Sequence, residues 1–370
     1  MSRTVKIQLN RAAVMGKGVP KEPMSLREII MMMAEPALLV QKGEIRAANE
    51  SALRLFGGEI TGKKAQELLD AETLRYSSRS YLAGTTIAGE EYVLRVRRVE
   101  EGRLVLLQRQ VPELSLLSDA FLYSLRSGLM NFGIAADRMR TVLEQNRELG
   151  LTGNMALLTA NYYKLMRMTE NAALVKNALE KKAVVVPKNL DLSLLTHSVL
   201  DAVEEAFPES VLVRSVDSGV HTAVDARLFK LLLLNLLSNC LLHAGADTIR
   251  VSLTELPDCV LLGVTDDGKG IPEGKLAGAF ERYRGGFSLG EMISGAGLGL
   301  AAARSVTALH DGTLLLASAE GEGTAVRASL SKRARACHLG SGEELCSMRD
   351  IQVGLADCLP ARYYEQEYLD

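Results

Sequence analysis

The chain has little of what nucleic-acid binding requires. It contains no tryptophan, and aromatic residues make up only 5% of its 370 positions. Surfaces that stack bases of single-stranded nucleic acid need such rings. Neither sign of charge is in excess, since 43 Lys and Arg residues face 45 Asp and Glu residues. Because nucleic-acid binders usually carry a basic excess, we expect no nucleic-acid partner.

The sequence also lacks closely spaced cysteine pairs and long apolar runs. Its five cysteines are odd in number and follow no signal peptide, which favours a reducing, cytoplasmic compartment. The longest apolar run near the start, Ile29 to Val40, is interrupted by Glu35 and Pro36. It covers about 12 residues, whereas a membrane-spanning helix needs about 20. We therefore expect a cytoplasmic protein without a membrane span.

Hydrophobic residues make up 47% of the chain, enough for the cores of two or three domains. The pattern predicts an α+β multidomain protein. We expect five segments: a flexible lead at 1–23, a small α+β module at 24–110, an antiparallel helical hairpin at 113–183, a C-terminal α/β sandwich at 188–331, and a tail at 332–370 to which the sequence assigns no role.

Short helix-like and strand-like pieces alternate within the 24–110 module. Turn pairs such as Lys42-Gly43 and Glu101-Gly102 separate residues rich in strand formers, which predicts antiparallel strands. The expected helices are 26–33 and 50–56, and the expected strands are 37–40, 44–48, 92–99 and 103–109.

Residues 113–182 have apolar side chains at steps of three and four, the spacing of a bundle helix. The break at 149–153 predicts two helices, the second with a seam that includes Leu158, Leu165 and Val175. A lone hairpin cannot bury its apolar stripe. We therefore expect a homodimer through residues 113–183 in a four-helix bundle, the alternative being packing against neighbouring domains.

Two asparagines stand out in the apolar segment 228–244. Asn235, Asn239 and His243 are four residues apart, so we expect them to share one face of a helix. Buried amides need partners, and an amide oxygen is a suitable ligand for magnesium. The segment therefore predicts a binding face whose amide oxygens suit a magnesium ion.

Two glycine-rich turns follow. In the first, a strand ends at Asp266, whose carboxylate can accept a hydrogen bond from an exocyclic amine such as that of adenine, while Gly268 and Gly270 allow close backbone approach to a flat ring. The second, 295–300, opens a helix whose free N–H groups suit phosphate. Its spacing alone also suits a dinucleotide-binding turn, but no βαβ unit follows.

The order of these motifs resembles the ATP-binding domain shared by sensor histidine kinases, type II topoisomerases and related chaperones, and the kinase pattern fits best. The resemblance spans residues 190–330 and rests on NLLSNCLLH at 235–243, DDGKGI at 266–271, FERYR at 280–284, GAGLGL at 295–300, and HDG with GEGT at 310–324.

The resemblance implies a site for ATP and Mg²⁺. It implies that Asn239 holds the magnesium ion with Asn235 nearby, that Asp266 contacts adenine, and that 285–294 is a mobile lid over the phosphates. The remaining nucleotide-binding positions that it implies are His243, Gly268, Gly270, Ile271, Gly295, Gly297, Leu298, Gly299 and Thr324. It also implies a PAS-type sensor module at 24–110, with Glu44, Ile45 and Asn49 in the expected places.

Two positions depart from the family pattern. Leu242 stands where a basic residue commonly contacts phosphate, a loss that Lys269 or Arg284 would have to compensate. Tyr123 occupies the place of the phosphate-accepting histidine, and no histidine occurs from 113 to 182. A phenol with a pKa of about 10 is a poor nucleophile without an adjacent base, and Ser124 cannot be that base.

These features predict a cytoplasmic signal-transduction protein that binds Mg-ATP but lacks conventional histidine autophosphorylation. A response regulator or another signalling protein is the expected partner. Three alternatives remain at this point: a kinase that phosphorylates a residue of a partner protein, an ATPase that drives conformational work, and an interaction scaffold that binds no nucleotide. Asn235 argues against the ATPase, because a water-activating glutamate would be expected there.

Overall fold

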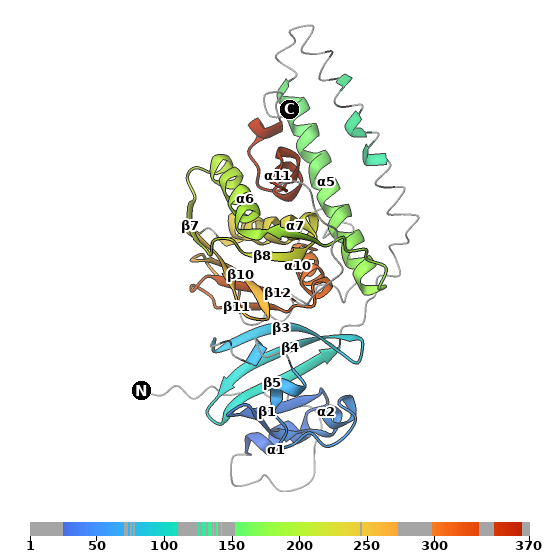
Figure 1. Ribbon diagram of the computed structural model, residues 1–370, viewed down its shortest axis with the longest axis vertical. Coiled ribbons are helices and arrows are strands. Elements are labelled where there is room, and N and C mark those ends of the chain that lie inside the picture. The colour runs from blue at the N-terminus through green and yellow to red at the C-terminus, as the bar shows by residue number, and fades with distance from the viewer. Residues whose placement is uncertain are drawn as a thin grey trace, which may run out of the picture.

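The computed structural model describes residues 25–69, 73–74, 76, 78–109, 152–244, 246–272, 298–332 and 344–364, with short pieces between 125 and 142. It shows a mixed α/β protein in which helices flank one large sheet (Figure 1). Tyr123, Arg284, Gly295, Gly297, the proposed lid and most of the first hairpin helix lie outside the described residues.

The N-terminal module, residues 25–109, begins with a short helix whose N-terminal cap is reciprocal. The Ser25 side chain accepts from the Glu28 amide, and the Glu28 carboxylate accepts from the Ser25 amide. The predicted helices and strands are confirmed to within a few residues, and β3 was not predicted. The elements are α1 (Leu26–Met32), β1 (Ala37–Gln41), β2 (Glu44–Ala48), α2 (Glu50–Leu55), η1 (Ala65–Glu67), β3 (Ser80–Ile87), β4 (Glu90–Val99) and β5 (Gly102–Arg109).

A long helix, α5 (Thr152–Leu179), connects to the C-terminal part of the chain. Its predicted seam is only partly buried. Val175 is buried, whereas Leu158 and Leu165 are exposed. The face that packs against the rest of the protein carries Arg167 and Asn171, which are one helical turn apart and both buried. The spacing of apolar residues along the helix therefore did not predict that this polar face is buried.

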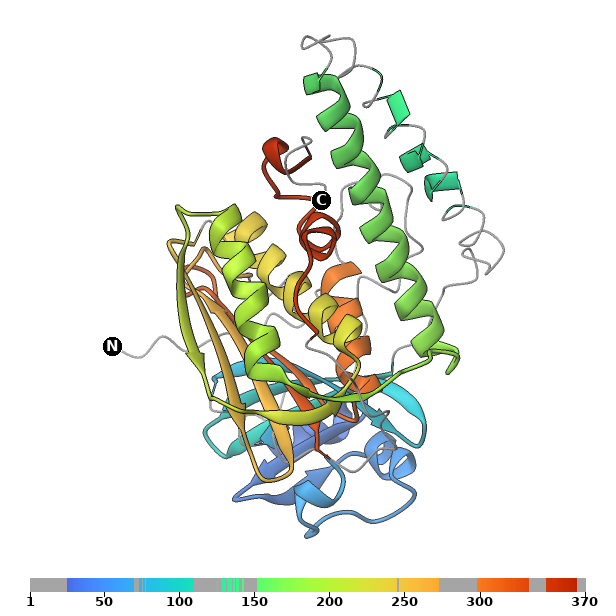
Figure 2. The ribbon, with the colours of Figure 1, turned by 45° about the horizontal axis from the view of Figure 1, so that its top comes forward.

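The C-terminal part pairs strands with helices that cover one side of the sheet (Figure 2). Its elements are β6 (Lys188–Asp191), α6 (Leu192–Ala206), β7 (Val211–Val216), β8 (His221–Val224), α7 (Ala226–Asn239), η3 (Cys240–Ala244), β9 (Thr248–Glu255), β10 (Cys259–Asp266), α10 (Leu298–Leu309), β11 (Leu314–Ser318), β12 (Thr324–Ser331), α11 (Met348–Gly354) and η4 (Ala361–Tyr364).

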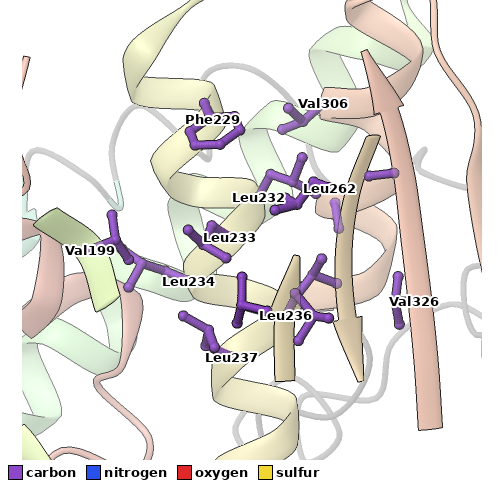
Figure 3. Packing of buried hydrophobic residues seen from close by; sticks show 14 of the residues in the cluster. Val199, Phe229, Leu232, Leu233, Leu234, Leu236, Leu237, Leu262, Val306 and Val326 are labelled. Atoms are coloured by element: carbon purple, nitrogen blue, oxygen red, sulfur yellow. The ribbon is translucent and has the colours of Figure 1, made fainter. Parts of the chain in front are cut away.

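The core of this part lies where α6, α7 and α10 meet the sheet. Leucines fill α7, and Figure 3 shows them between Val199 on one side and Leu262 and Val326 on the other. Phe229 and Leu232 are fully buried. Apolar residues therefore cover most of the surface of α7. Each buried polar side chain on this helix needs a hydrogen-bond partner.

One sheet of ten strands runs through both parts of the protein, in the order β2-β1-β5-β4-β3-β11-β12-β10-β9-β7. The two parts join where β3 pairs antiparallel with β11, Leu82 opposite Leu316 and Ala83 opposite Leu315. Successive side chains of a strand point to opposite faces of the sheet. Strands β3 and β11 therefore each contribute side chains to the core of the other part. Leu82 packs into the C-terminal core, and Leu315 packs into the N-terminal core.

Part of the tail, residues 344–364, is integral to the fold, although the sequence showed no periodicity there. Helix α11 lies between α5 and α6 (Figures 1 and 2). Ile351, Leu355 and Tyr364 are almost fully buried in the C-terminal core, and Lys230 of α7 bonds Asp350 at 2.6 Å.

No helix among the described residues is long and apolar enough to cross a membrane.

Candidate functional site

The candidate site is formed by the C-terminal end of α7, the end of β10 and the start of α10. Asn235 and Asn239 both face Gly299, because a Cβ atom built on that glycine would lie 3.1 and 3.7 Å from their side-chain oxygens. An alanine at 299 would press on the Asn235 amide and would be in ordinary contact with the Asn239 amide. The two asparagines therefore share a helix face, as the sequence predicted, and α10 approaches that face closely.

The regular helix ends at Asn239. Residues 240–244 continue as a π-helical turn, in which the hydrogen-bond step is longer than in an α-helix. The spacing of four therefore does not keep His243 in line with the two asparagines, and the side chain of His243 lies outside the described residues. Leu242, where a basic residue was expected, is partly exposed beside the site.

Asp266 fixes the loop after β10. Its Oδ1 accepts hydrogen bonds from the backbone amides of Gly268 at 3.1 Å and Thr324 at 3.2 Å. The Cys240 thiol also donates to this carboxylate, and burial, followed by the charge of Asp266, raises the pKa of that thiol well above its usual value. Asp266 is thus buried, held by the backbone and adjacent to the end of α7.

The glycines around Asp266 are required by close backbone approach. Gly270 has φ +63°, and an added Cβ atom would lie 1.9 Å from the carbonyl oxygen of Ala319. Gly323 has φ +78°, and its added Cβ would lie 2.0 Å from the carbonyl oxygen of Asp266. The Ile271 amide donates to Ser318 Oγ at 2.8 Å, which ties the loop to β11. The backbone, more than side chains, shapes this part of the site.

Asn235 has partners that the sequence did not predict. Its Oδ1 accepts from Arg167 Nη2 at 2.9 Å and from Asn171 Nδ2 at 3.1 Å, and its Nδ2 donates to Asn171 Oδ1 at 3.1 Å and to the Leu231 carbonyl at 3.0 Å. Arg167 Nη1 also pairs with Asp357 of the tail at 2.5 Å. No sequence signal connected these three segments, because they lie far apart along the chain.

The arrangement suits a ligand with a flat ring and an anionic end. Asp266 is an acceptor beside glycine turns, the N-terminus of α10 carries the partial positive charge of a helix start, and Asn239 offers an amide oxygen to a hard cation. Asn239 is half-buried and Gly299 lies opposite it. Among the described residues, no cluster of three His, Cys, Asp or Glu side chains could hold a metal ion.

The profile of the family "Histidine kinase-, DNA gyrase B-, and HSP90-like ATPase" matches residues 224–334, which contain Asn235, Asn239, Asp266 and Gly299. This segment is an ATP-binding domain of the histidine kinase type. The sensor histidine kinase YvrG of Bacillus subtilis is similar to this chain, with 34% identity over 120 residues, 32% of this chain and 21% of that protein.

The non-motile and phage-resistance protein of Caulobacter vibrioides is 40% identical over 117 residues, 30% of this chain and 14% of its own length. The matched part of the chain thus spans 21% of the length of YvrG and 14% of the length of the Caulobacter protein. Among solved structures, the mycobacterial sensor histidine kinase MprB is 25% identical, with a TM-score of 0.34, and covers 40% of this chain and 100% of its own.

Proposed function

We propose that this protein is a signal-transduction protein of the sensor histidine kinase type whose ATP-binding domain binds Mg-ATP. The observation that supports the proposal is that Asn239 faces Gly299 and that Cys240, the residue after Asn239, bonds Asp266, all within the segment that matches the ATPase family. In this assignment Asp266 accepts a hydrogen bond from the adenine amine. Asn239 provides an oxygen ligand to magnesium, and the start of α10 faces the phosphates.

Thermal unfolding tests this proposal. A ligand that binds only the folded state stabilises it by mass action, so millimolar Mg-ATP should raise the melting temperature of the intact chain. Asn239→Ala and Asp266→Ala should each abolish the rise. An unchanged melting temperature for the wild-type chain would mean that the protein is an interaction scaffold without nucleotide.

We further propose that the protein alone does not autophosphorylate, neither on histidine nor on Tyr123. The hairpin segment contains no histidine, and Tyr123 stands at the acceptor position without an adjacent base. Incubation with γ-labelled ATP should leave the protein alone unlabelled. Acid-stable label on Tyr123 would contradict this, whereas label transferred to an added response regulator or other partner protein would identify an active kinase with its acceptor elsewhere.

One feature supports a PAS-type sensor module, and another supports a homodimer. In the N-terminal module, Asn49 caps α2 by accepting from the Ala52 amide, and its side chain also bonds the segment before β1, which fits a PAS-type role for that residue. On α5, Leu157, Leu158 and Leu165 are exposed in the single chain. A second copy that packs on residues 113–183 would cover them, and sedimentation equilibrium would detect that homodimer.

A further inference from the structure

A buried arginine from outside the family domain reaches the candidate nucleotide site. Arg167 belongs to α5, well before residue 224, yet it is only 7% exposed. Together with Asn239, Leu242, Leu298 and Gly299 it lines a small open cavity of about 20 Å³. A space of this size is enough for one water molecule or one phosphate oxygen. The guanidinium therefore lies beside both the start of α10 and the proposed magnesium ligand.

The charge of Arg167 is held in place by two other segments. Asp357 of the tail takes one N–H group at 2.5 Å, and Asn235 of α7 takes another at 2.9 Å. Burial lowers the pKa of the guanidinium, and the charge of Asp357 opposes that shift. A guanidinium has five N–H donors in a rigid fork, so these two bonds orient the group and leave further donors for a ligand.

We propose that Arg167 is the cationic residue that binds the outer phosphates of the nucleotide, delivered to the site by α5. The proposal rests on the proposed binding of Mg-ATP. Leu242, which lines the same cavity, supplies no charge, and Lys269 is exposed in the loop after β10. Arg167 is the buried cation among the described residues that line this cavity. A planar fork of donors matches the oxygens of a phosphate.

This assignment also gives Asn235 a definite role. Its amide is fully engaged, with two bonds accepted by the oxygen and two donated by the nitrogen. An amide in that state has no capacity left for a metal ion. Asn235 is therefore a positioning residue that, with Asp357, aims Arg167 into the cavity, and Asn239 alone serves as the metal ligand of the pair.

Nucleotide affinity measured by calorimetry on the full chain tests the proposal, with Mg-ATP compared against AMP. Arg167→Met should weaken ATP binding by about tenfold to a hundredfold, the effect of losing a charged hydrogen bond, while AMP affinity stays nearly constant. Arg167→Lys, which keeps the charge without the fork, should restore part of the loss. Arg250→Met is the control, because Arg250 is an exposed arginine on β9 of the ATP-binding domain and does not line this cavity.

The outcomes separate the two proposals. If the wild-type chain binds neither ATP nor AMP, the proposed function fails and this inference fails with it. If wild type binds ATP and folded Arg167→Met binds it equally well, only the role of Arg167 is wrong. Tighter ATP binding by Arg167→Met would overturn the inference in the opposite direction, showing that Arg167 blocks the site. If Arg167→Met does not fold, Arg167→Lys decides by its ratio of ATP to AMP affinity.

Discussion

Two asparagines of one motif, four residues apart, have different environments. Asn235 is buried and its whole hydrogen-bonding capacity is used by protein groups, whereas Asn239 is half-buried beside Gly299. Protein groups also use both ring nitrogens of His310. Its Nδ1 donates to the Val306 carbonyl, and its Nε2 accepts from the Asp225 amide. That pattern requires the neutral imidazole and joins the end of α10 to the cap of α7.

The turn beside Asp266 gives a prediction at the residue scale. Gly321 and Gly323 have nearly the same φ, +79° and +78°, but an added Cβ atom meets nothing within 4 Å at Gly321 and lies 2.0 Å from the Asp266 carbonyl at Gly323. Both alanine variants should lose about 1–2 kcal/mol from the unusual φ. Gly323→Ala should lose clearly more in urea unfolding, and it should also weaken ATP binding. Equal losses would mean that the backbone contact does not constrain the site.

At the scale of elements, the segment 344–364 acts as part of the core. Leu355 is 0% exposed, whereas Leu345 in the same segment is 47% exposed. Leu355→Ala should lower the free energy of unfolding by about 2–5 kcal/mol, because it leaves a cavity in a packed core. Leu345→Ala should change it by less than about 0.5 kcal/mol. Urea denaturation of both variants measures the difference, and a mild effect of Leu355→Ala would show that the segment is dispensable for folding.

Thiol chemistry reports on the same packing. Burial raises the pKa of Cys358 to about 11 and that of Cys346 to about 12. The thiolate is the reactive form, so both should be alkylated slowly by iodoacetamide at pH 8 in the native protein, and the rate at Cys358 should climb until about pH 11. Mass spectrometry of peptides follows each site, with urea-unfolded protein as the control. Native rates equal to the unfolded rates would mean that the segment does not stay packed.

The same shift predicts how stability depends on pH. The folded pKa of Cys358 lies above the ordinary value of 9.0, so the folded state holds its proton more tightly than the unfolded chain. Its contribution to stability is therefore complete below pH 9.0 and declines as the pH rises towards about 11. Denaturation at a series of pH values should show weaker stability in that window, and Cys358→Ala should reduce the decline.

At the scale of the whole molecule, the continuous sheet connects the N-terminal module to the ATP-binding domain. Besides the β3–β11 pairing, the guanidinium of Arg327 on β12 lies 4.9 Å from the ring centre of Tyr76. Gly84 of β3 accommodates the side chain of Arg304 on α10, since a Cβ atom there would lie 2.7 Å from it. Helix α10 therefore contacts the module through Arg304 and carries Gly299 of the candidate site near its start.

We expect this junction to make the two parts unfold together. Leu82→Ala, on β3, should speed amide hydrogen exchange in β11 and β12 as well as in β3, because Leu82 packs into the core of the ATP-binding domain. Leu39→Ala is the control, since Leu39 is about as buried but packs in a cluster of the module that contains no residue of β11. Unchanged protection of β11 in Leu82→Ala would show that the two parts fold independently.

The secondary structure and part of the site could be predicted because their signals are local. Turn pairs located β1, β2, β4 and β5, and the motif order located Asn239, Asp266 and Gly299. Strand β3 was missed, since Ser80–Ile87 has no strict alternation of apolar and polar residues. Arg167 was missed for a different reason: within a helical pattern, a charged residue reads as solvent-exposed until its buried partners are known.

The family of residues 224–334 and the chemistry available to its site follow from the sequence alone, because glycine turns and amides at fixed spacing are properties of short segments. The groups that meet at the site depend instead on the packing of the whole chain. Arg167, Asn235 and Asp357 come from three distant segments, and their contact depends on how α5 and the tail pack against α7. Contacts between distant segments produce no periodic pattern of residues within any one segment, so the sequence does not predict them.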